Sequence, residues 1–225
     1  MAYEYIERNL REINEELSDI SHGRAVTLVA VTKSGTDDEL IALCAAGATC
    51  IGENRPQELC RRADLLRASG YSPIMHQIGN LQRNKVRTVI QTASIIHTVD
   101  NLALAEEINK RAAAAGITMP VLIEVNSASE PQKDGVLPER AEDLLLALRE
   151  LPGLSVRGLM TMGPVCDGEQ IRPYFRLTRE LFDRLGDKYG WQGEGILSMG
   201  MSDSYRIAIE EGSTLVRIGR RLFTK

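Results

Sequence analysis

The segment AVTLVAVTK, residues 25–33, gives the first indication of the architecture. Its first eight residues are small, apolar or β-branched without polar alternation, which is typical of a strand buried on both faces. Before it, Ile6, Leu10, Ile13 and Leu17 recur at spacings of four, three and four residues, and this stripe predicts an amphipathic helix. The chain is therefore expected to pass from an outer helix into a central strand.

Short apolar runs of the same kind return seven times, separated by segments with helical periodicity. The expected further strands are ATCIG (48–52), IMHQIG (74–79), SIIHTV (94–99), PVLIEVN (120–126), SVRGLM (155–160), GILSM (195–199) and TLVRIG (214–219). The expected helices between and after them are residues 36–46, 56–68, 81–91, 101–115, 138–151, 171–189 and 203–211.

Strict alternation of strands and helices predicts parallel pairing through right-handed crossovers. Eight strands in 225 residues leave about 28 residues per unit, which favours an α/β fold of the (β/α)8 TIM-barrel type, as a single domain over residues 1–225. A doubly wound open sheet is the alternative. Because only RRLFTK, residues 220–225, follows the last strand, the N-terminal helix is expected to complete the outer ring.

Several helix boundaries carry their own signals. Asp100 stands where an N-cap would precede the helix from residue 101, and Gly116 stands where a left-handed residue would close it. Pro56 and Pro138 fit first-turn positions, where the missing N–H costs nothing.

Composition excludes several classes of protein. Hydrophobic residues at 43% and charged residues at 26% are those of a folded globular chain, and a net charge of −4 argues against a nucleic-acid binder. No apolar run approaches the roughly 20 residues of a membrane-spanning helix, and the charged opening MAYEYIERNL is unlike a signal peptide. The four cysteines form no CxxC pair and are expected to be reduced thiols. We therefore expect a cytoplasmic protein without a membrane or nucleic-acid partner.

Candidate chemistry lies at the carboxyl ends of the strands, where barrels of this type place their active face. Lys33 directly follows the first strand. An amine at the mouth of an apolar barrel is expected to lose hydration and can form a Schiff base with an aldehyde. The alternative is a solvated surface lysine.

The last two strands end in residues suited to a phosphate. Strand seven runs into the small-residue turn that contains Met201 and Ser202, and strand eight runs into Gly219 and Arg220. Loops after strands seven and eight are the common phosphate site of this architecture. Taken separately, Ser202 as a helix cap and Gly219 as a turn residue are the simpler explanations. Together with Lys33, these loops can hold the two ends of one phosphorylated aldehyde.

Arg217 alternates to the inside of the last expected strand, where a permanent charge needs a partner. If a pyridoxal ring spans from the lysine to the phosphate loops, Arg217 can meet the ring nitrogen and oppose its protonation. A surface ion pair is the alternative.

His76 and His97 fall within strands and are expected to be buried, hydrogen-bonded rings. Three histidines without metal-ligand spacing favour no metal site.

The chain resembles a known family over most of its length, from about Val26 to Phe223. The motifs that carry the resemblance are AVTK (30–33), IGENRPQE (51–58), HQIGNLQRNK (76–85), IHTVD (96–100), EVN (124–126), GLMTMGP (158–164), LSMGMSDS (197–204) and GSTLVRIGRRLF (212–223). They resemble those of the pyridoxal phosphate homeostasis proteins, single-domain relatives of the N-terminal barrel of alanine racemase.

The resemblance implies a barrel that holds pyridoxal 5′-phosphate as an aldimine. The residues implied are Lys33 for the aldimine, Met201, Ser202, Gly219 and Arg220 for the phosphate, Arg217 for the pyridine nitrogen, and Asn54 near the cofactor. The family is known for binding this cofactor and balancing vitamin B6 and amino-acid pools, without an established catalytic reaction. The chain departs from the usual family motifs at Met75, Asn80, Arg55 and Pro56, which concern the rim of the expected pocket.

Three functions follow as hypotheses. The first is a monomeric carrier of pyridoxal phosphate, with apo-enzymes that use the cofactor as candidate recipients. The second is an amino-acid racemase or related enzyme using the same cofactor. Racemisation needs a base on each face of the substrate carbanion, and related racemases bring the second base from a domain that this chain is expected to lack. The third is a sugar-phosphate barrel in which Lys33 is an aldolase-type lysine.

Overall fold

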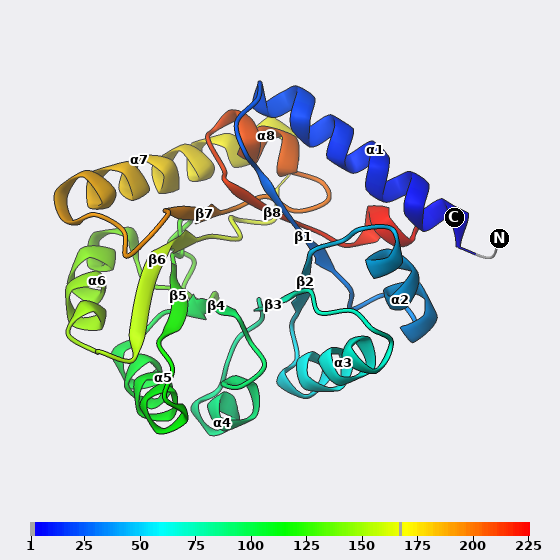
Figure 1. Ribbon diagram of the computed structural model, residues 1–225. Helices are drawn as coiled ribbons and strands as arrows, with labels where there is room; N and C mark the ends of the chain where they lie inside the picture. The colour runs from blue at the N-terminus through cyan, green and yellow to red at the C-terminus, as the bar shows by residue number, and fades with distance from the viewer. Residues whose placement is uncertain (1–2, 167) are drawn as a thin grey trace.

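The computed structural model describes residues 3–166 and 168–225. Within them, eight parallel strands follow one another in chain order and close into a barrel, with β1 hydrogen-bonded to both β2 and β8 (Figure 1). Both the TIM-barrel prediction and its single-domain form are confirmed, and the open sheet is excluded by the β1–β8 pairing.

The strands lie close to the positions expected from the apolar runs. They are β1 Thr27–Val31, β2 Cys50–Glu53, β3 Ile74–Gln77, β4 Ile95–Val99, β5 Met119–Glu124, β6 Leu154–Met160, β7 Ile196–Ser198 and β8 Leu215–Ile218. The α-helices are α1 Glu4–Ser21, α2 Asp37–Ala45, α3 Pro56–Ala68, α4 Val86–Val89, α5 Leu102–Ala115, α6 Ala141–Arg149, α7 Arg172–Tyr189 and α8 Tyr205–Glu210. Four 3₁₀ turns accompany them, namely η1 Arg83–Lys85, η2 Pro138–Arg140, η3 Gly168–Ile171 and η4 Arg220–Phe223.

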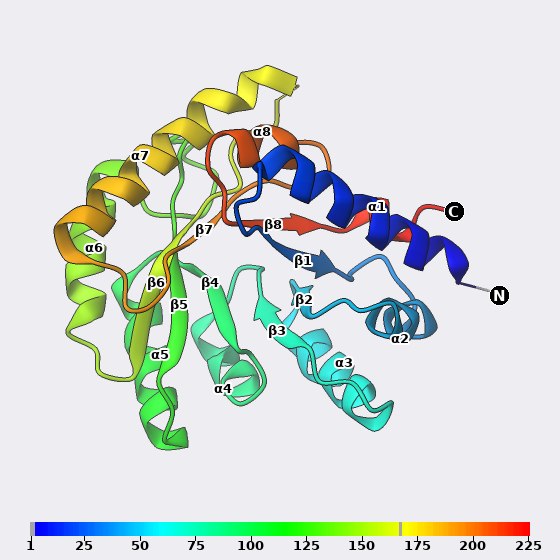
Figure 2. The same ribbon diagram turned by 45° about the horizontal axis from the view of Figure 1, so that its top comes forward.

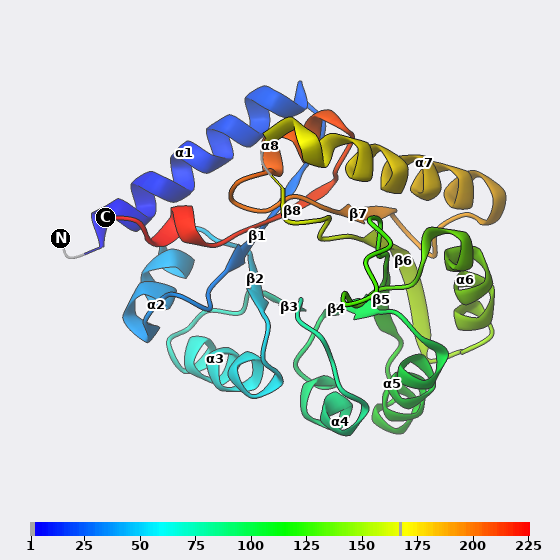
Figure 3. The same ribbon diagram turned by 180° about the vertical axis from the view of Figure 1, so that it is seen from behind.

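The N-terminal helix completes the outer ring, as predicted. Figures 1 and 3 show α1 beside both α2 and α8, and Figure 2 shows it lying along β8 and β1. Asn9 on α1 donates to the carbonyl oxygens of Leu222 and Thr224, at 3.3 and 2.7 Å. Glu16 accepts two hydrogen bonds from Arg221, each of 2.9 Å. The helix therefore holds the short segment that follows the last strand.

Local signals explain most helix ends. A capping box opens α2, in which the Thr36 hydroxyl accepts from the Glu39 amide and the Glu39 carboxylate accepts from the Thr36 amide. The predicted cap at Asp100 is wrong, because the side chain of Asn101 accepts from the Leu104 amide instead. Gly116 closes α5 with a φ of 68°, as expected.

The segment expected as a helix over 81–91 is much shorter in the structure. It holds only the 3₁₀ turn η1 and the single turn of α4. Leu81 and Ile90 are both buried at the ends of this segment, so its apolar residues anchor a compact connection instead of forming one face of a long helix.

The interior of the barrel changes from apolar to polar along its axis. Two small apolar clusters lie inside it, one from Val29, Cys50 and Leu215, the other from Ile95, Leu122 and Met160. Further toward the carboxyl ends, the inward positions are His76, His97, Glu124, Ser198 and Arg217, all buried. The large core between the strands and the helix ring is apolar. No helix among residues 3–166 and 168–225 combines the length and hydropathy needed to cross a bilayer.

Candidate cofactor site

The first and last strands bring Lys33 next to the loops after β7 and β8. In the β1–β8 ladder, Val29 is opposite Arg217 and Ala30 is opposite Ile218. Lys33 lies in the turn after β1, two residues beyond Val31. Its side chain is exposed, so the expectation that the amine loses hydration is wrong for the ligand-free chain. The amine is accessible to a molecule at the barrel mouth.

The loops after β7 and β8 meet each other at Ser202 and Gly219. The Gly219 amide donates to the Ser202 hydroxyl over 3.4 Å. A Cβ atom at Gly219 would lie 2.9 Å from the carbonyl oxygen of Val31, so only glycine lets β8 approach the end of β1 this closely. The two loops and the lysine turn therefore share one side of the barrel mouth.

The turn before α8 offers hydrogen-bond donors. Gly200 has a φ of 96°, and a Cβ there would lie 2.6 Å from Ala208, so a glycine is needed to fold this turn against α8. The amide of Met201 donates to the Ser204 hydroxyl at 3.2 Å. No described residue accepts a hydrogen bond from the amides of Ser202 or Asp203. Free amides beside a close-approach glycine form an anion cradle.

Arg217 lies inside the barrel and is only 4% exposed. Its guanidinium donates to the carbonyl oxygen and the hydroxyl of Ser198, at 3.0 and 2.5 Å, and to the carbonyl oxygen of Thr161 at 3.0 Å. Burial lowers its pKa to about 10, and the nearby Glu124 opposes this shift. The charge is thus retained at neutral pH, and the surface ion pair considered as an alternative is excluded.

A chain of buried side chains continues from Arg217 across the barrel. Ser198 Oγ lies 3.2 Å from His97 Nδ1, and His97 Nε2 lies 2.9 Å from His76 Nδ1. Because Ser198 Oγ accepts from Arg217, its own hydrogen is available for donation to His97 Nδ1. The hydrogen of His97 is then assigned to Nε2, which donates to His76 Nδ1, and the hydrogen of His76 is assigned to its Nε2. Burial lowers the pKa of His76 to about 4 and that of His97 well below its usual value. Both rings are therefore neutral, buried and hydrogen-bonded, as expected.

Glu124 faces a small cavity over the ends of β5 and β6. The cavity measures about 190 Å³ and is also lined by Asn126, Lys133 and Thr161. Burial, helped by the negative charges of Asp100 and Asp134, raises the pKa of Glu124 to about 7. At neutral pH the Glu124 carboxyl group is therefore protonated in a substantial fraction of the molecules, and this proton lies at the mouth of the barrel.

The other residues expected at the site lie on its rim. Asn54 follows β2 with an exposed side chain, and its carbonyl oxygen accepts from Gln77 at 3.1 Å. Met201 is 40% exposed. Arg220 is exposed and pairs with Asp203 on the opposite loop. Lys33, Ser202, Gly219 and Arg220 thus gather on the side formed by β1, β7 and β8, while Asn54 lies on neighbouring β2.

Of the family departures, Met75 lies away from the barrel mouth, whereas Arg55 and Pro56 directly follow Asn54 at the rim. Met75 packs in the core between the strands and the helices. Arg55 and Pro56 open α3, with the Arg55 side chain exposed. Asn80 does lie near the mouth, where its amide donates to Asp134 over 2.8 Å.

A buried ion pair beside Lys33 was not expected from the sequence. Arg62 on α3 and Glu53 at the end of β2 are joined at 2.8 Å, and both contact Thr32. A signal was available, because Leu59, Arg62, Ala63 and Leu66 share one face of the helix and the other three are apolar. An arginine on the buried face of a helix requires a partner.

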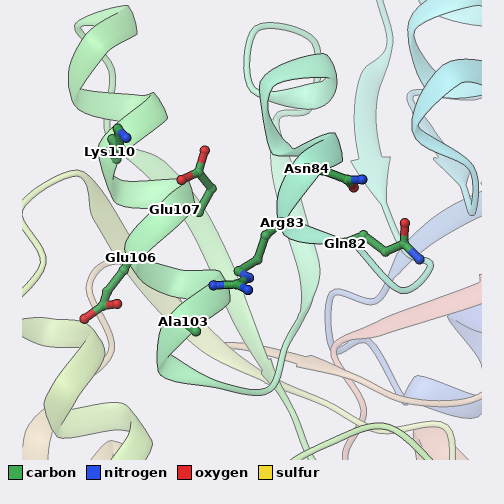
Figure 4. Close-up of a pocket in the computed structure, with 7 residues that line it drawn as sticks. All are labelled: Gln82, Arg83, Asn84, Ala103, Glu106, Glu107 and Lys110. Carbon is green, nitrogen blue, oxygen red and sulfur yellow. The ribbon is translucent and has the colours of Figure 1, made fainter.

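Another cavity, of about 750 Å³, lies elsewhere. Figure 4 shows that it is lined by polar side chains from η1 and α5, with Arg83 lying among Glu106, Glu107 and Lys110. None of the predicted site residues contributes to it. Its mixed charges select no ligand class, so the barrel mouth remains the candidate site.

The sequence matches a known family over nearly its whole length. The family model described as "Alanine racemase, N-terminal domain" matches residues 2–224, so the chain belongs to that family. Within it, the chain is 39% identical over 224 residues to the pyridoxal phosphate homeostasis protein of Aquifex aeolicus, covering 99% of this chain and 97% of that protein. The chain therefore belongs to the pyridoxal phosphate homeostasis protein family.

Solved structures agree with the fold. PipY of Synechococcus elongatus, whose structure contains bound pyridoxal phosphate, superposes with a TM-score of 0.86 and is 28% identical, covering 97% of this chain and 100% of that one. Alanine racemase from Corynebacterium glutamicum superposes with a TM-score of 0.75 at 18% identity, covering 99% of this chain and 61% of that one. The second likeness shows the shared barrel fold.

Proposed function

We propose that this chain binds pyridoxal 5′-phosphate at the barrel mouth, held covalently by Lys33 and by its phosphate on the loops after β7 and β8. The observation that carries the proposal is the β1–β8 pairing, which sets an accessible lysine beside an anion cradle. The names of the relatives and the cofactor bound to PipY support the same ligand.

The phosphate end fits the free amides of Ser202 and Asp203, with Gly219 giving it room for close approach. Met201 and Arg220 flank this cradle, and the Arg220 guanidinium at its rim is paired with the Asp203 carboxylate. At the other end, the Lys33 amine would hold the aldehyde carbon covalently, its two hydrogens leaving with the carbonyl oxygen as water.

Between the two ends, Arg217 is proposed to face the pyridine nitrogen. Its hydrogen bonds to Ser198 and Thr161 fix the guanidinium, and its pKa of about 10 keeps it charged. A fixed cation opposes protonation of the ring nitrogen and so weakens the ring as an electron sink. Asn54 on the rim of β2 is proposed to lie near the ring.

A carrier role accounts for these features better than racemase activity. Racemisation depends on a strong electron sink and on a proton carrier on each face of the substrate. The charged Arg217 works against the first requirement, and the relatives are named for homeostasis of the cofactor. We propose a monomeric cytoplasmic carrier that delivers the cofactor to apo-enzymes.

Colour and turnover test the proposal together. The purified chain, after addition of pyridoxal phosphate and removal of the unbound cofactor, should absorb visible light and lose that absorbance on borohydride reduction. A chain that stays colourless would refute cofactor binding and favour a sugar-phosphate barrel. Loss of optical rotation from L-alanine, above the background of the free cofactor, would instead favour the racemase.

A further inference from the structure

The turn that carries Lys33 rests on a buried ion pair from two other elements. Arg62 comes from α3 and Glu53 from the end of β2, and their side chains are 8% and 3% exposed. Arg62 Nη1 and Glu53 Oε1 are 2.8 Å apart. Removing two charges from water is costly, so the pair needs a compensating set of hydrogen bonds.

Those compensating bonds go to the residues on either side of Lys33. Arg62 donates through Nη1 to the carbonyl oxygen of Thr32, and through Nη2 to that of Gly35 at 3.0 Å. Glu53 accepts a further hydrogen bond from the Thr32 hydroxyl. The Gly35 amide closes the turn by donating to the Thr32 carbonyl at 2.9 Å. Both ends of the four-residue turn are therefore anchored.

The turn also packs against the segment that follows the last strand. A Cβ atom at Gly35 would lie 2.6 Å from the ring of Phe223, which belongs to η4 after the last strand. The backbone of the turn is thus held by the Arg62 guanidinium and packs against the Phe223 ring. The side chain of Lys33 is exposed.

We propose that Arg62 and Glu53 are positioning residues for the covalent step at Lys33. The inference rests on the proposed function. A backbone already fixed in place has less conformational freedom to lose when the amine bonds to the aldehyde, and fixing a single residue costs about a factor of 10 in an equilibrium constant. The pair acts through the turn, and among the described residues it makes no hydrogen bond to Ser202, Asp203 or Gly219.

The neighbouring Arg61 provides a matched control. It lies on the same helix and pairs at the surface with Asp37 and with Glu58, which also lies 3.6 Å from Arg62. Among the described residues, Arg61 makes no hydrogen bond to the Lys33 turn. Arg61→Met and Arg62→Met remove the same chemical group one residue apart. Arg62→Lys keeps a charge but has no planar fork with which to bind both carbonyl oxygens.

The experiment compares two ligands that differ in one group. Pyridoxal 5′-phosphate carries the aldehyde, and pyridoxine 5′-phosphate carries an alcohol in its place with the same ring and phosphate. Arg62→Met should weaken binding of the aldehyde about tenfold and leave binding of the alcohol unchanged. Arg62→Lys should lie between wild type and Arg62→Met, and Arg61→Met should change neither affinity. An equal loss for both ligands, or no loss for either, would overturn the inference.

Hydrogen exchange of the ligand-free chain gives a second readout. The Gly35 amide should exchange faster in Arg62→Met than in Arg61→Met. If Arg62→Met fails to fold, Arg62→Lys takes its place in the same comparison. If wild type forms no borohydride-stable adduct at Lys33, the proposed function fails. The positioning of the turn is then tested by hydrogen exchange of the Gly35 amide alone. An exchange rate equal to that of wild type in the Arg62 variants would overturn it.

Discussion

Replacement of Glu124 by glutamine should remove a step in the pH dependence of stability. Glu124 is 5% exposed, and no described residue donates a hydrogen bond to its side chain. Burial raises its pKa from 4.5 to about 7. The folded chain therefore binds this proton more tightly than the unfolded chain, and stability is lost as pH rises from 4.5 through about 7.

The size of the step follows from the two pKa values. A difference between 4.5 and about 7 corresponds to about 3 kcal/mol once Glu124 is ionised in both states. Between about pH 5 and about pH 9, wild type should lose about 2 to 3 kcal/mol through this group. Glu124→Gln is neutral throughout and should not show this loss, so its stability relative to wild type should rise by that amount.

Urea denaturation at the two pH values measures the difference. Glu139→Gln, at an exposed position on η2, serves as the control for removing one carboxylate from the surface. The difference in unfolding free energy between Glu124→Gln and wild type could instead be the same at both pH values, within about 1 kcal/mol. This would show that the Glu124 carboxyl group is already ionised in the folded chain at the lower pH. That result would refute the assignment of a proton to the barrel mouth.

Three further substitutions test the site. Lys33→Ala should abolish the borohydride-sensitive visible absorbance while thermal unfolding stays unchanged; retained absorbance would place the adduct elsewhere. Gly219→Ala forces a Cβ to 2.9 Å from the Val31 carbonyl, so it should cost about 1–3 kcal/mol and speed release of the cofactor, measured by denaturation and by off-rate. Ser198→Ala removes the hydroxyl shared by Arg217 and His97 and should cost about 1–3 kcal/mol; unchanged stability would contradict the buried network.

The barrel could be predicted because each strand is recognisable from its own short stretch of sequence. Each is a short apolar run, and the alternation with helices fixes parallel pairing. The place of α1 followed from the shortage of chain after β8. Finer choices depended on geometry that spacing does not reveal, as with the cap at Asn101 in place of Asp100.

The candidate site was predicted in part. Lys33, Ser202 and Gly219 could be found because each follows a strand. The chain from Arg217 through Ser198 to His97 could not, because Ser198 and His97 are 101 residues apart and meet only inside the closed barrel. For Arg62 the apolar face of α3 signals that a partner is needed, but the spacing does not identify the partners, because two of them are backbone carbonyl oxygens, which any sequence supplies.

A crystal structure of the chain with pyridoxal 5′-phosphate tests the central claim most directly. Continuous density should join Lys33 Nζ to the ligand, with the phosphate within hydrogen-bond distance of the amides of Ser202 and Asp203 and the ring nitrogen facing Arg217. A phosphate bound away from the loops after β7 and β8, or a covalent bond to a different lysine, would contradict the account.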